Sequence, residues 1–252
     1  MTTTYFTSPE GRRLAYRASA PTHSPLTYVW LSGFKSDMSG TKVTELEAWD
    51  TEAGHGFLAF DYSGHGLSDG AFEDGTISAW REDALAAIDT HSTGPIVLVG
   101  SSMGGWMALL AALARPDRVA GLVLIAPAPD FTEKLMWPEF SAEAQSEIME
   151  QGFTQRPSDY DEPYTITRAL IEDGQTWQIL DAPIKLDIPV RILQGMQDAD
   201  VPWKHAERLV DTITSEDLVF TLIKDGDHRL SREQDIARLK TTCAEIATAT
   251  RP

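Results

Sequence analysis

The stretch Gly100-Ser101-Ser102-Met103-Gly104 decides the fold of this chain of 252 residues. It follows the apolar run Ile96–Val99 and precedes a helix-like run from Trp106 to Arg115. A strand, a tight turn and a helix around a Gly-x-Ser-x-Gly pattern are typical of a nucleophile elbow. The glycines are expected because a sharp turn presses the flanking positions against strand and helix, where a Cβ has no room. Ser102 is therefore the candidate nucleophile, with its hydroxyl at the N-terminus of a helix.

Apolar runs with little alternation recur along the chain, as expected for parallel strands that are covered on both faces. The expected strands are Leu14–Arg17, Thr27–Leu31, Phe57–Asp61, Ile96–Val99, Leu122–Ile125, Val190–Gln194 and Val219–Ile223, and the last six are runs of this kind. The helix-like runs between most of them are Val43–Ala53, Ile77–His91, Ser102–Arg115, His205–Thr212 and Arg232–Thr248. This alternation predicts an α/β fold with a mostly parallel, doubly wound sheet.

The alternation breaks between Pro127 and Pro189, where no convincing strand appears. The interval holds amphipathic pieces around Glu133–Phe140, Ala142–Gly152, Tyr164–Glu172 and Trp177–Leu180. We expect residues 128–187 to form a helical cap, inserted into a core made of residues 1–127 and 188–252. Ligand sites lie at the carboxyl ends of parallel strands, beneath such a cap. The candidate substrate-binding side chains are therefore Trp137, Met136, Phe140 and Trp177.

A serine at neutral pH is a poor nucleophile and needs an adjacent base that an acid orients. In chains with this elbow, the acid and then the base follow the serine along the sequence. His228 comes after the expected strand Val219–Ile223 and is the candidate base. His65, in the turn from Asp61 to Gly66, is expected to be structural. The remaining histidines, expected in loops or on helix surfaces, are His23, His55, His91 and His205.

Two carboxylates in the loop after Val190–Gln194 compete for the role of the acid. Asp198 is favoured because it lies three residues after Gly195 and three before Val201, the usual spacing for this acid. Asp200 remains an alternative. Asp130, which follows an earlier strand, is a more distant one.

The developing oxyanion of the reaction needs two hydrogen-bond donors. One candidate is the backbone N–H of Met103, the residue after the nucleophile. The other is the backbone N–H of Phe34, in the loop that follows the expected strand Thr27–Leu31. Gly33 precedes it and lets this backbone approach the elbow closely.

The formal net charge is −17, with acidic residues spread along the chain. Such a surface repels nucleic acid and anionic membranes, so neither is an expected partner. The single cysteine, Cys243, excludes an internal disulfide and a cysteine metal cluster, and we expect it to be buried on the last helix.

No stretch reaches the length of a membrane span. Residues Met1 to Gly11 lack the basic and apolar regions of a signal peptide, so a cytoplasmic protein is expected.

The motifs together resemble the α/β-hydrolase superfamily. Within it, the chain is similar to the mitochondrial palmitoyl-protein thioesterase and acyl-glucuronide esterase group of animals and its bacterial relatives. The stretches that carry this resemblance are Ser36–Lys42, Asp61–Gly70, Gly100–Trp106, Ala114–Pro116, Gly195–Trp203 and Asp227–Arg229. The resemblance implies an acyl-enzyme on Ser102, with Asp198 and His228, and neither a metal nor a cofactor. Similarity is thin in the cap, so specificity for palmitoyl groups is not implied, and no N-terminal extension for mitochondrial import is seen.

The leading hypothesis is a serine hydrolase that cleaves carboxylic esters or thioesters with an apolar acyl group. Its expected substrate is a small acyl ester or thioester, and an acylated protein is a further candidate. One alternative is a non-enzymatic ligand-binding protein of the same fold. Another is a hydrolase of C–C or peptide bonds.

Overall fold

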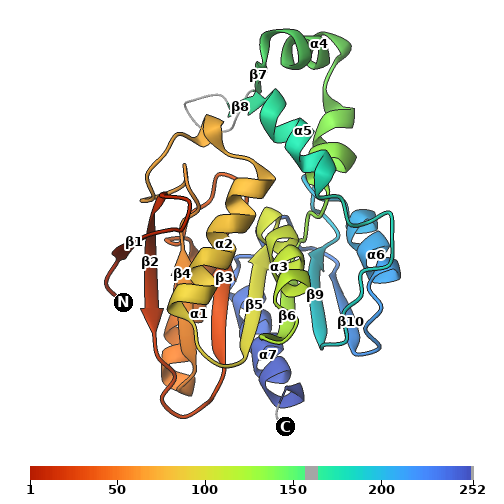
Figure 1. Cartoon of the computed structure of the whole chain (residues 1–252). Helices are drawn as coiled ribbons and strands as arrows, with labels where there is room; N and C mark the ends of the chain where they lie inside the picture. Colours follow the sequence, from red (N-terminus) through yellow and green to blue (C-terminus); the bar gives the residue numbers. More distant parts are fainter. Residues whose placement is uncertain (157–163, 251–252) are drawn as a thin grey trace.

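The computed structural model describes residues 1–156 and 164–250, and an eight-stranded sheet lies at the centre of this part (Figure 1). The strand order is β1-β2-β4-β3-β5-β6-β9-β10. From β4 onward in this order the strands are parallel, whereas β2 and β1 pair antiparallel at one edge. The strands are β1 (Thr4–Thr7), β2 (Arg13–Ser19), β3 (Thr27–Leu31), β4 (Gly56–Phe60), β5 (Ile96–Ser101), β6 (Val119–Ile125), β9 (Val190–Gly195) and β10 (Leu218–Ile223).

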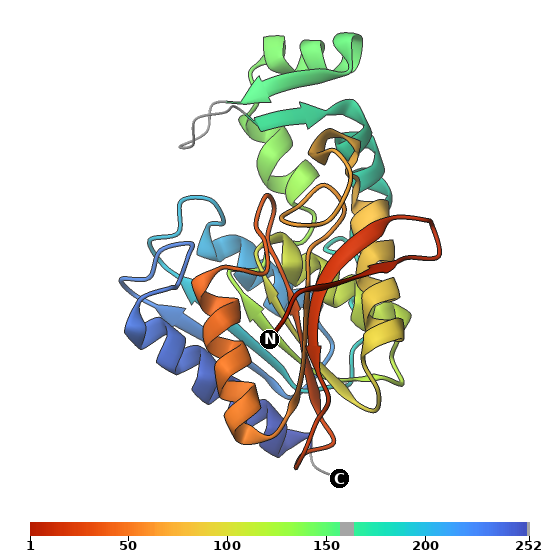
Figure 2. The same ribbon diagram turned by 90° about the vertical axis from the view of Figure 1, so that its left-hand side faces the viewer.

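Helices cover both faces of the sheet, which buries the apolar strands on two sides. One face carries α2 (Ile77–His91), α3 (Met103–Ala114) and α6 (Trp203–Thr212), and the other carries α1 (Thr41–Ala53) and α7 (Glu233–Ala249). Figure 2 shows α1 and α7 together on one side, with α2 on the opposite side. A separate apolar cluster fills each interface. The predicted α/β class is therefore confirmed.

The predicted core strands and helices are all present, with ends that differ by a few residues. The edge strand β1 was not predicted. Its sequence, Thr-Tyr-Phe-Thr, is short and mostly exposed, so it carries no apolar run to detect. Cys243 is buried on α7 as expected.

The interval between β6 and β9 contains a β-hairpin, so the expectation that it holds no strand is wrong. After a short helical turn (η2, Thr132–Met136; η3, Trp137–Glu139), α4 (Ala142–Gln151) leads into β7 (Phe153–Arg156). β7 pairs antiparallel with β8 (Tyr164–Thr167), and α5 (Arg168–Thr176) follows. These elements sit together at one end of the sheet (Figure 2). The cap boundaries at 128 and 187 remain a proposal.

The amphipathic piece Tyr164–Glu172, expected within a helical cap, is a strand followed by a helix, and Thr167 marks the change. The Thr167 side chain accepts a hydrogen bond from the Leu170 N–H at 3.2 Å, which caps the start of α5. The strand β8, which ends at Thr167, has the alternating sequence Tyr-Thr-Ile-Thr that suits a hairpin. The predicted piece Trp177–Leu180 forms no helix, because the N–H groups of Ile179 and Leu180 donate to the Asp130 carboxylate instead.

None of the helices in the described ranges combines the length and the apolar character that crossing a bilayer demands.

One acid on the buried face of α1 lacks a hydrogen-bond partner for its side chain in the described part of the chain. Asp50 is 0% exposed, and neither of its carboxylate oxygens has a hydrogen-bond partner among the described residues. Burial away from water raises the pKa of Asp50 to about 9. The native protein therefore keeps this proton at neutral pH, whereas the unfolded chain releases it near pH 4.

We expect Asp50→Asn to stabilise the protein at pH 8 and to have little effect at pH 4. The pKa is raised in the native state, so native stability falls as pH rises from about 4 toward 9. Asparagine resembles the protonated acid and removes this penalty. The melting temperature at pH 8 should rise by about 5 °C, measured by thermal unfolding across this pH range. Glu52→Gln, an exposed change on the same helix, is the control. An equal effect of Asp50→Asn at both pH values would contradict the assignment.

Candidate active site

Ser102 lies on the turn between β5 and α3 with a φ of 57° and a ψ of −120°. This is a strained conformation for a residue with a side chain. A Cβ on Gly100 would overlap the carbonyl oxygen of Gly104, and one on Gly104 would overlap that of Leu31. Glycine is therefore required on both sides of the serine, for the steric reason expected from the sequence.

Backbone hydrogen bonds hold the strained turn in place. The Ser102 N–H donates to the carbonyl oxygen of Ile125 at 2.9 Å, at the end of the neighbouring strand β6. The Ser102 carbonyl oxygen accepts from Gly105 at 2.8 Å and from Ala128 at 3.1 Å. The sheet and the segment after β6 thus both fix the position of the serine.

Asp198 is the acid that contacts His228. Its Oδ2 atom accepts a hydrogen bond from His228 Nδ1 at 2.9 Å and another from Gln194 Nε2 at 3.0 Å. Its Oδ1 atom accepts from the N–H groups of Asp200 at 3.0 Å and Val201 at 2.8 Å. The carboxylate is buried, and these donors replace the water that an ionised acid otherwise needs.

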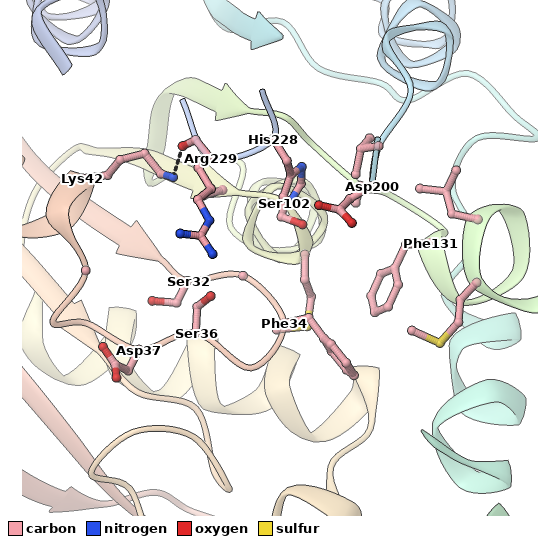
Figure 3. A pocket seen from close by; sticks show the side chains of 18 of the residues that line it. Ser32, Phe34, Ser36, Asp37, Lys42, Ser102, Phe131, Asp200, His228 and Arg229 are labelled. Atoms are coloured by element: carbon pink, nitrogen blue, oxygen red, sulfur yellow. Dashed lines mark hydrogen bonds between the residues drawn. The ribbon is translucent and has the colours of Figure 1, made fainter. Parts of the chain in front are cut away.

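The loop that carries His228 lies directly against the loop of Asp198. The Gln197 N–H donates to the carbonyl oxygen of Gly226 at 2.8 Å. A Cβ on Gly195 would overlap the same carbonyl group, so the close approach depends on glycine there. Since Nδ1 of His228 donates to Asp198, its Nε2 carries no proton in the neutral ring, as the predicted base requires. Figure 3 shows the side chains of Ser102 and His228 next to each other in one pocket.

The two alternative acids have other positions. Asp200 is exposed and lines the pocket, and no hydrogen bond joins it to His228 among the described residues. Asp130 is buried, and its two oxygens accept from Ile179 and Leu180 at 2.9 Å each. Burial raises the pKa of Asp130, which these two backbone donors counteract. Asp130 therefore ties the end of the cap segment to its start.

Asp198, Asp200 and His228 have ligand-type atoms within 4.8 Å of one another, a spacing that a cation could bridge. The Asp198 oxygens, however, already accept bonds from nitrogen donors on both sides. Hydrogen bonding accounts for this arrangement without a metal ion.

The loop after β3 lies against the elbow. A Cβ on Gly33 would come within 3.2 Å of the Ser101 carbonyl oxygen and 3.3 Å of the Ser102 Cβ. Phe34 and Met103 both line the pocket that holds Ser102. In the part of the chain that the structure describes, neither backbone N–H donates to a protein acceptor. Neither N–H group is thus occupied by a protein acceptor among the described residues, as the predicted oxyanion donors require. The role of Phe34 and Met103 as oxyanion donors remains a proposal.

The pocket around Ser102 has a volume of about 750 Å³. Figure 3 shows Phe34 and Phe131, with Asp200, on one side of Ser102, and Ser32, Ser36, Asp37, Lys42 and Arg229 on the other. We call the side of the two phenylalanines the apolar half and the other side the polar half. The lining also includes the apolar side chains of Leu135, Met136, Ile166 and Val201 and the charged side chains of Glu139 and Arg156. Burial lowers the pKa of Lys42 to about 8, and its Nζ donates to the carbonyl oxygen of Arg229, beside His228.

Of the predicted substrate-binding residues, only Met136 is among the described residues that line this pocket. Trp177 instead donates through Nε1 to Ser78 Oγ at 2.7 Å, and its ring lies under the Arg81 guanidinium. Trp137 and Phe140 pack against each other, with ring centroids 6.2 Å apart. Periodicity within the cap identified apolar residues but did not show which of them pack together.

Several lining residues were not predicted. Ser32 and Ser36 follow the end of β3, and Phe131 follows β6. Their position directly after parallel strands was the sequence signal that could have identified them as pocket residues. Arg229 is next to the base in sequence. His205, expected on a surface, is buried, and its Nε2 donates to the carbonyl oxygen of Pro129 at 2.7 Å.

Residues 27–239 match a family model described as "Alpha/beta hydrolase family". The chain belongs to the alpha/beta hydrolase family. The mitochondrial palmitoyl-protein thioesterase ABHD10 of Homo sapiens is 37% identical over 220 residues, which cover 86% of this chain and 72% of that protein. The crystal structure of a hydrolase from Agrobacterium vitis S4 is 44% identical, with a TM-score of 0.94 and 98% of each chain covered. The structure of ABHD10 from mouse is 34% identical, with a TM-score of 0.89, and 98% of this chain and 99% of that one are covered.

These similarities confirm the recognition of the family from its motifs. They also correct one expectation. The ABHD10 relatives from five mammals are all named mitochondrial, so the predicted cytoplasmic location is wrong by this comparison.

The two aspartates of the loop allow a matched test of the acid. Asp198→Asn should lower kcat by about 10³- to 10⁴-fold, because the amide cannot accept the His228 Nδ1 proton in the same way and favours the wrong tautomer. Asp200→Asn should lower kcat by less than about tenfold. Steady-state turnover of an activated ester by both variants measures this difference. A larger loss for Asp200→Asn would transfer the role of the acid to Asp200.

Proposed function

We propose that this protein is a serine hydrolase that cleaves carboxylic ester or thioester bonds through an acyl-enzyme on Ser102. The observation that carries the proposal is the 2.9 Å hydrogen bond between Asp198 and His228, in the pocket that also holds Ser102. Relatives named palmitoyl-protein thioesterase support the ester or thioester as the bond that is cleaved.

In the first step, His228 Nε2 accepts the Ser102 hydroxyl proton while Oγ attacks the carbonyl carbon of the substrate. The N–H groups of Phe34 and Met103 bind the oxyanion of the tetrahedral intermediate. His228 then gives the proton to the leaving alcohol or thiol, and the acyl group stays on Ser102.

In the second step, water attacks the acyl-enzyme and gives its proton to His228. The same two N–H groups bind the second oxyanion, and collapse of the intermediate releases a carboxylic acid. Ser102 recovers its proton from His228. Asp198 keeps the imidazole in one tautomer and stabilises its positive charge through both steps.

The two halves of the pocket suggest how a substrate is oriented. The apolar half suits the acyl group, because burying a hydrocarbon chain against Phe131, Leu135 and Met136 is favourable. The polar half is left for the alcohol or thiol portion. The length of the acyl group is then limited by the side chains of the cap.

The direct test is turnover of matched ester and thioester series, from acetyl to palmitoyl, by the wild-type protein and Ser102→Ala. We expect activity that peaks at one chain length and falls by several orders of magnitude in the variant. A fluorophosphonate probe should label the wild type and leave Ser102→Ala unlabelled. Turnover that survives the loss of Ser102 would refute the mechanism. Tight ligand binding without any turnover would favour the non-enzymatic binding protein.

Filling the apolar half should shorten the preferred acyl chain. Leu135→Trp adds bulk to the pocket lining, so we expect the optimum of the ester series to move to shorter chains, with acetyl ester turnover within about threefold of wild type. Trp137→Phe is the matched control, because Trp137 lies in the same segment and is outside the described pocket lining. An unchanged chain-length profile for Leu135→Trp would place the acyl group elsewhere.

A further inference from the structure

The turn that follows β4 lies under the active site and carries a buried histidine. His65 is 4% exposed and stands between two glycines with positive φ angles, 72° at Gly64 and 49° at Gly66. A Cβ on Gly64 would lie 2.7 Å from the Ala71 carbonyl oxygen, so the turn is packed too closely for a side chain there. The tight turn thus holds His65 in one place.

Both ring nitrogens of His65 have backbone partners. The Lys35 N–H donates to Nε2 at 3.2 Å, and Nδ1 lies 3.2 Å from the Ser63 carbonyl oxygen. Since Nε2 accepts, the ring proton is on Nδ1 and is donated to Ser63. Burial lowers the pKa of His65 to about 4, so the ring is neutral at physiological pH and Nε2 stays an acceptor.

The accepted N–H belongs to the loop proposed to hold the oxyanion. Lys35 directly follows Phe34 and has a φ of 53°, which a lysine adopts only under constraint. A second bond closes the same loop, from the Ser36 N–H to the Gly33 carbonyl oxygen at 3.1 Å. The bond to His65 holds the peptide group between Phe34 and Lys35. It therefore also restrains the adjacent peptide group, which carries the Phe34 N–H.

The ring of His65 is held by the same aromatic side chains as the ring of Phe34. The His65 ring centroid is 5.2 Å from that of Phe72 and 5.1 Å from that of Trp80. Phe34 contacts the same two rings, at 4.9 Å and 5.9 Å. The rings of His65 and Phe34 therefore belong to one cluster of packed aromatic side chains, together with Phe72 and Trp80.

A further hydrogen bond joins the turn after β4 to the loop after β3. Asp61, four residues before His65, accepts from the Met38 N–H at 2.7 Å and from the Leu67 N–H at 2.9 Å. The turn after β4 thus holds the loop after β3 at Lys35 and again at Met38.

We infer that His65 is a positioning residue for the oxyanion hole: its Nε2 holds the Lys35 N–H and thereby keeps the Phe34 N–H directed at the reacting carbonyl oxygen. The inference rests on the proposed function, because it assumes Phe34 as an oxyanion donor. His65 does not touch the substrate in this assignment. Its contribution appears only where negative charge develops, in the transition states of both steps.

The test compares His65→Leu, which removes the acceptor, with His65→Gln, whose amide oxygen can replace it. For His65→Leu we expect kcat on a p-nitrophenyl ester to fall by about 10- to 100-fold, with KM changed less than about twofold. The affinity for a trifluoromethyl ketone, which forms a tetrahedral oxyanion on the serine, should fall in parallel. His65→Gln should recover most of both losses. A general packing defect would not separate kcat from KM or respond to the amide.

Tyr28→Phe is the control for loss of one buried hydrogen bond outside this aromatic cluster, since Tyr28 Oη donates to the Cys243 carbonyl oxygen at 2.7 Å. We expect its kcat to stay within about threefold of wild type. Equal losses in Tyr28→Phe and His65→Leu would overturn the inference, as would unchanged kcat in His65→Leu.

A measurement on the wild-type protein does not depend on whether the variants fold. Amide hydrogen exchange followed by NMR should show the Lys35 N–H protected at neutral pH. Rapid exchange at Lys35 would overturn the inference. Ser102→Ala separates the two proposals: if it is inactive while His65→Leu is fully active, only the role of His65 fails, and if it is active, the proposed function fails.

Discussion

The strained turn at Ser102 is the constraint on which the rest of the site depends. A residue with a φ of 57° and a ψ of −120° is unfavourable by itself, so the surrounding structure must hold it. The bond from Ser102 to the end of β6 and the close packing of Gly104 on Leu31 supply this support from the strands on either side of β5. Because β5 lies between β3 and β6, the turn is supported from both sides. At the end of an edge strand, the turn would have a neighbouring strand on one side alone.

The same parallel sheet explains why residues far apart in sequence meet at Ser102. The carboxyl ends of β3, β5, β9 and β10 lie along one side of the sheet, so the loops that follow them carry the residues proposed as oxyanion backbone, nucleophile, acid and base. Close approach between these loops is then decided by small residues. Gly33 faces the elbow and Gly195 faces the loop of His228, and at both positions a Cβ would press on backbone.

Sequence patterns predicted the core well because its signals are local. The apolar strands and the elbow glycines are each visible within a few residues, and the predicted serine, acid and base each lie in a loop directly after such a strand. The cap was predicted less well, since its hairpin is made of two strands of four residues, with polar and apolar side chains mixed. The pocket lining depends on which cap side chains pack on each other. Trp177 bonds to Ser78, about one hundred residues earlier, and no local pattern reports such a contact.

Burial adds to spacing the physical reason that distinguishes the two aspartates of the β9 loop. An acid that orients an imidazole must stay ionised away from water, which requires hydrogen-bond donors in place of water. Asp198 has them on both oxygens, whereas Asp200 is open to solvent in the pocket. One of those donors is the backbone N–H of Asp200 itself. The turn that directs the Asp200 side chain into the pocket therefore also stabilises the charge on Asp198, so the two residues could not exchange roles without a different turn.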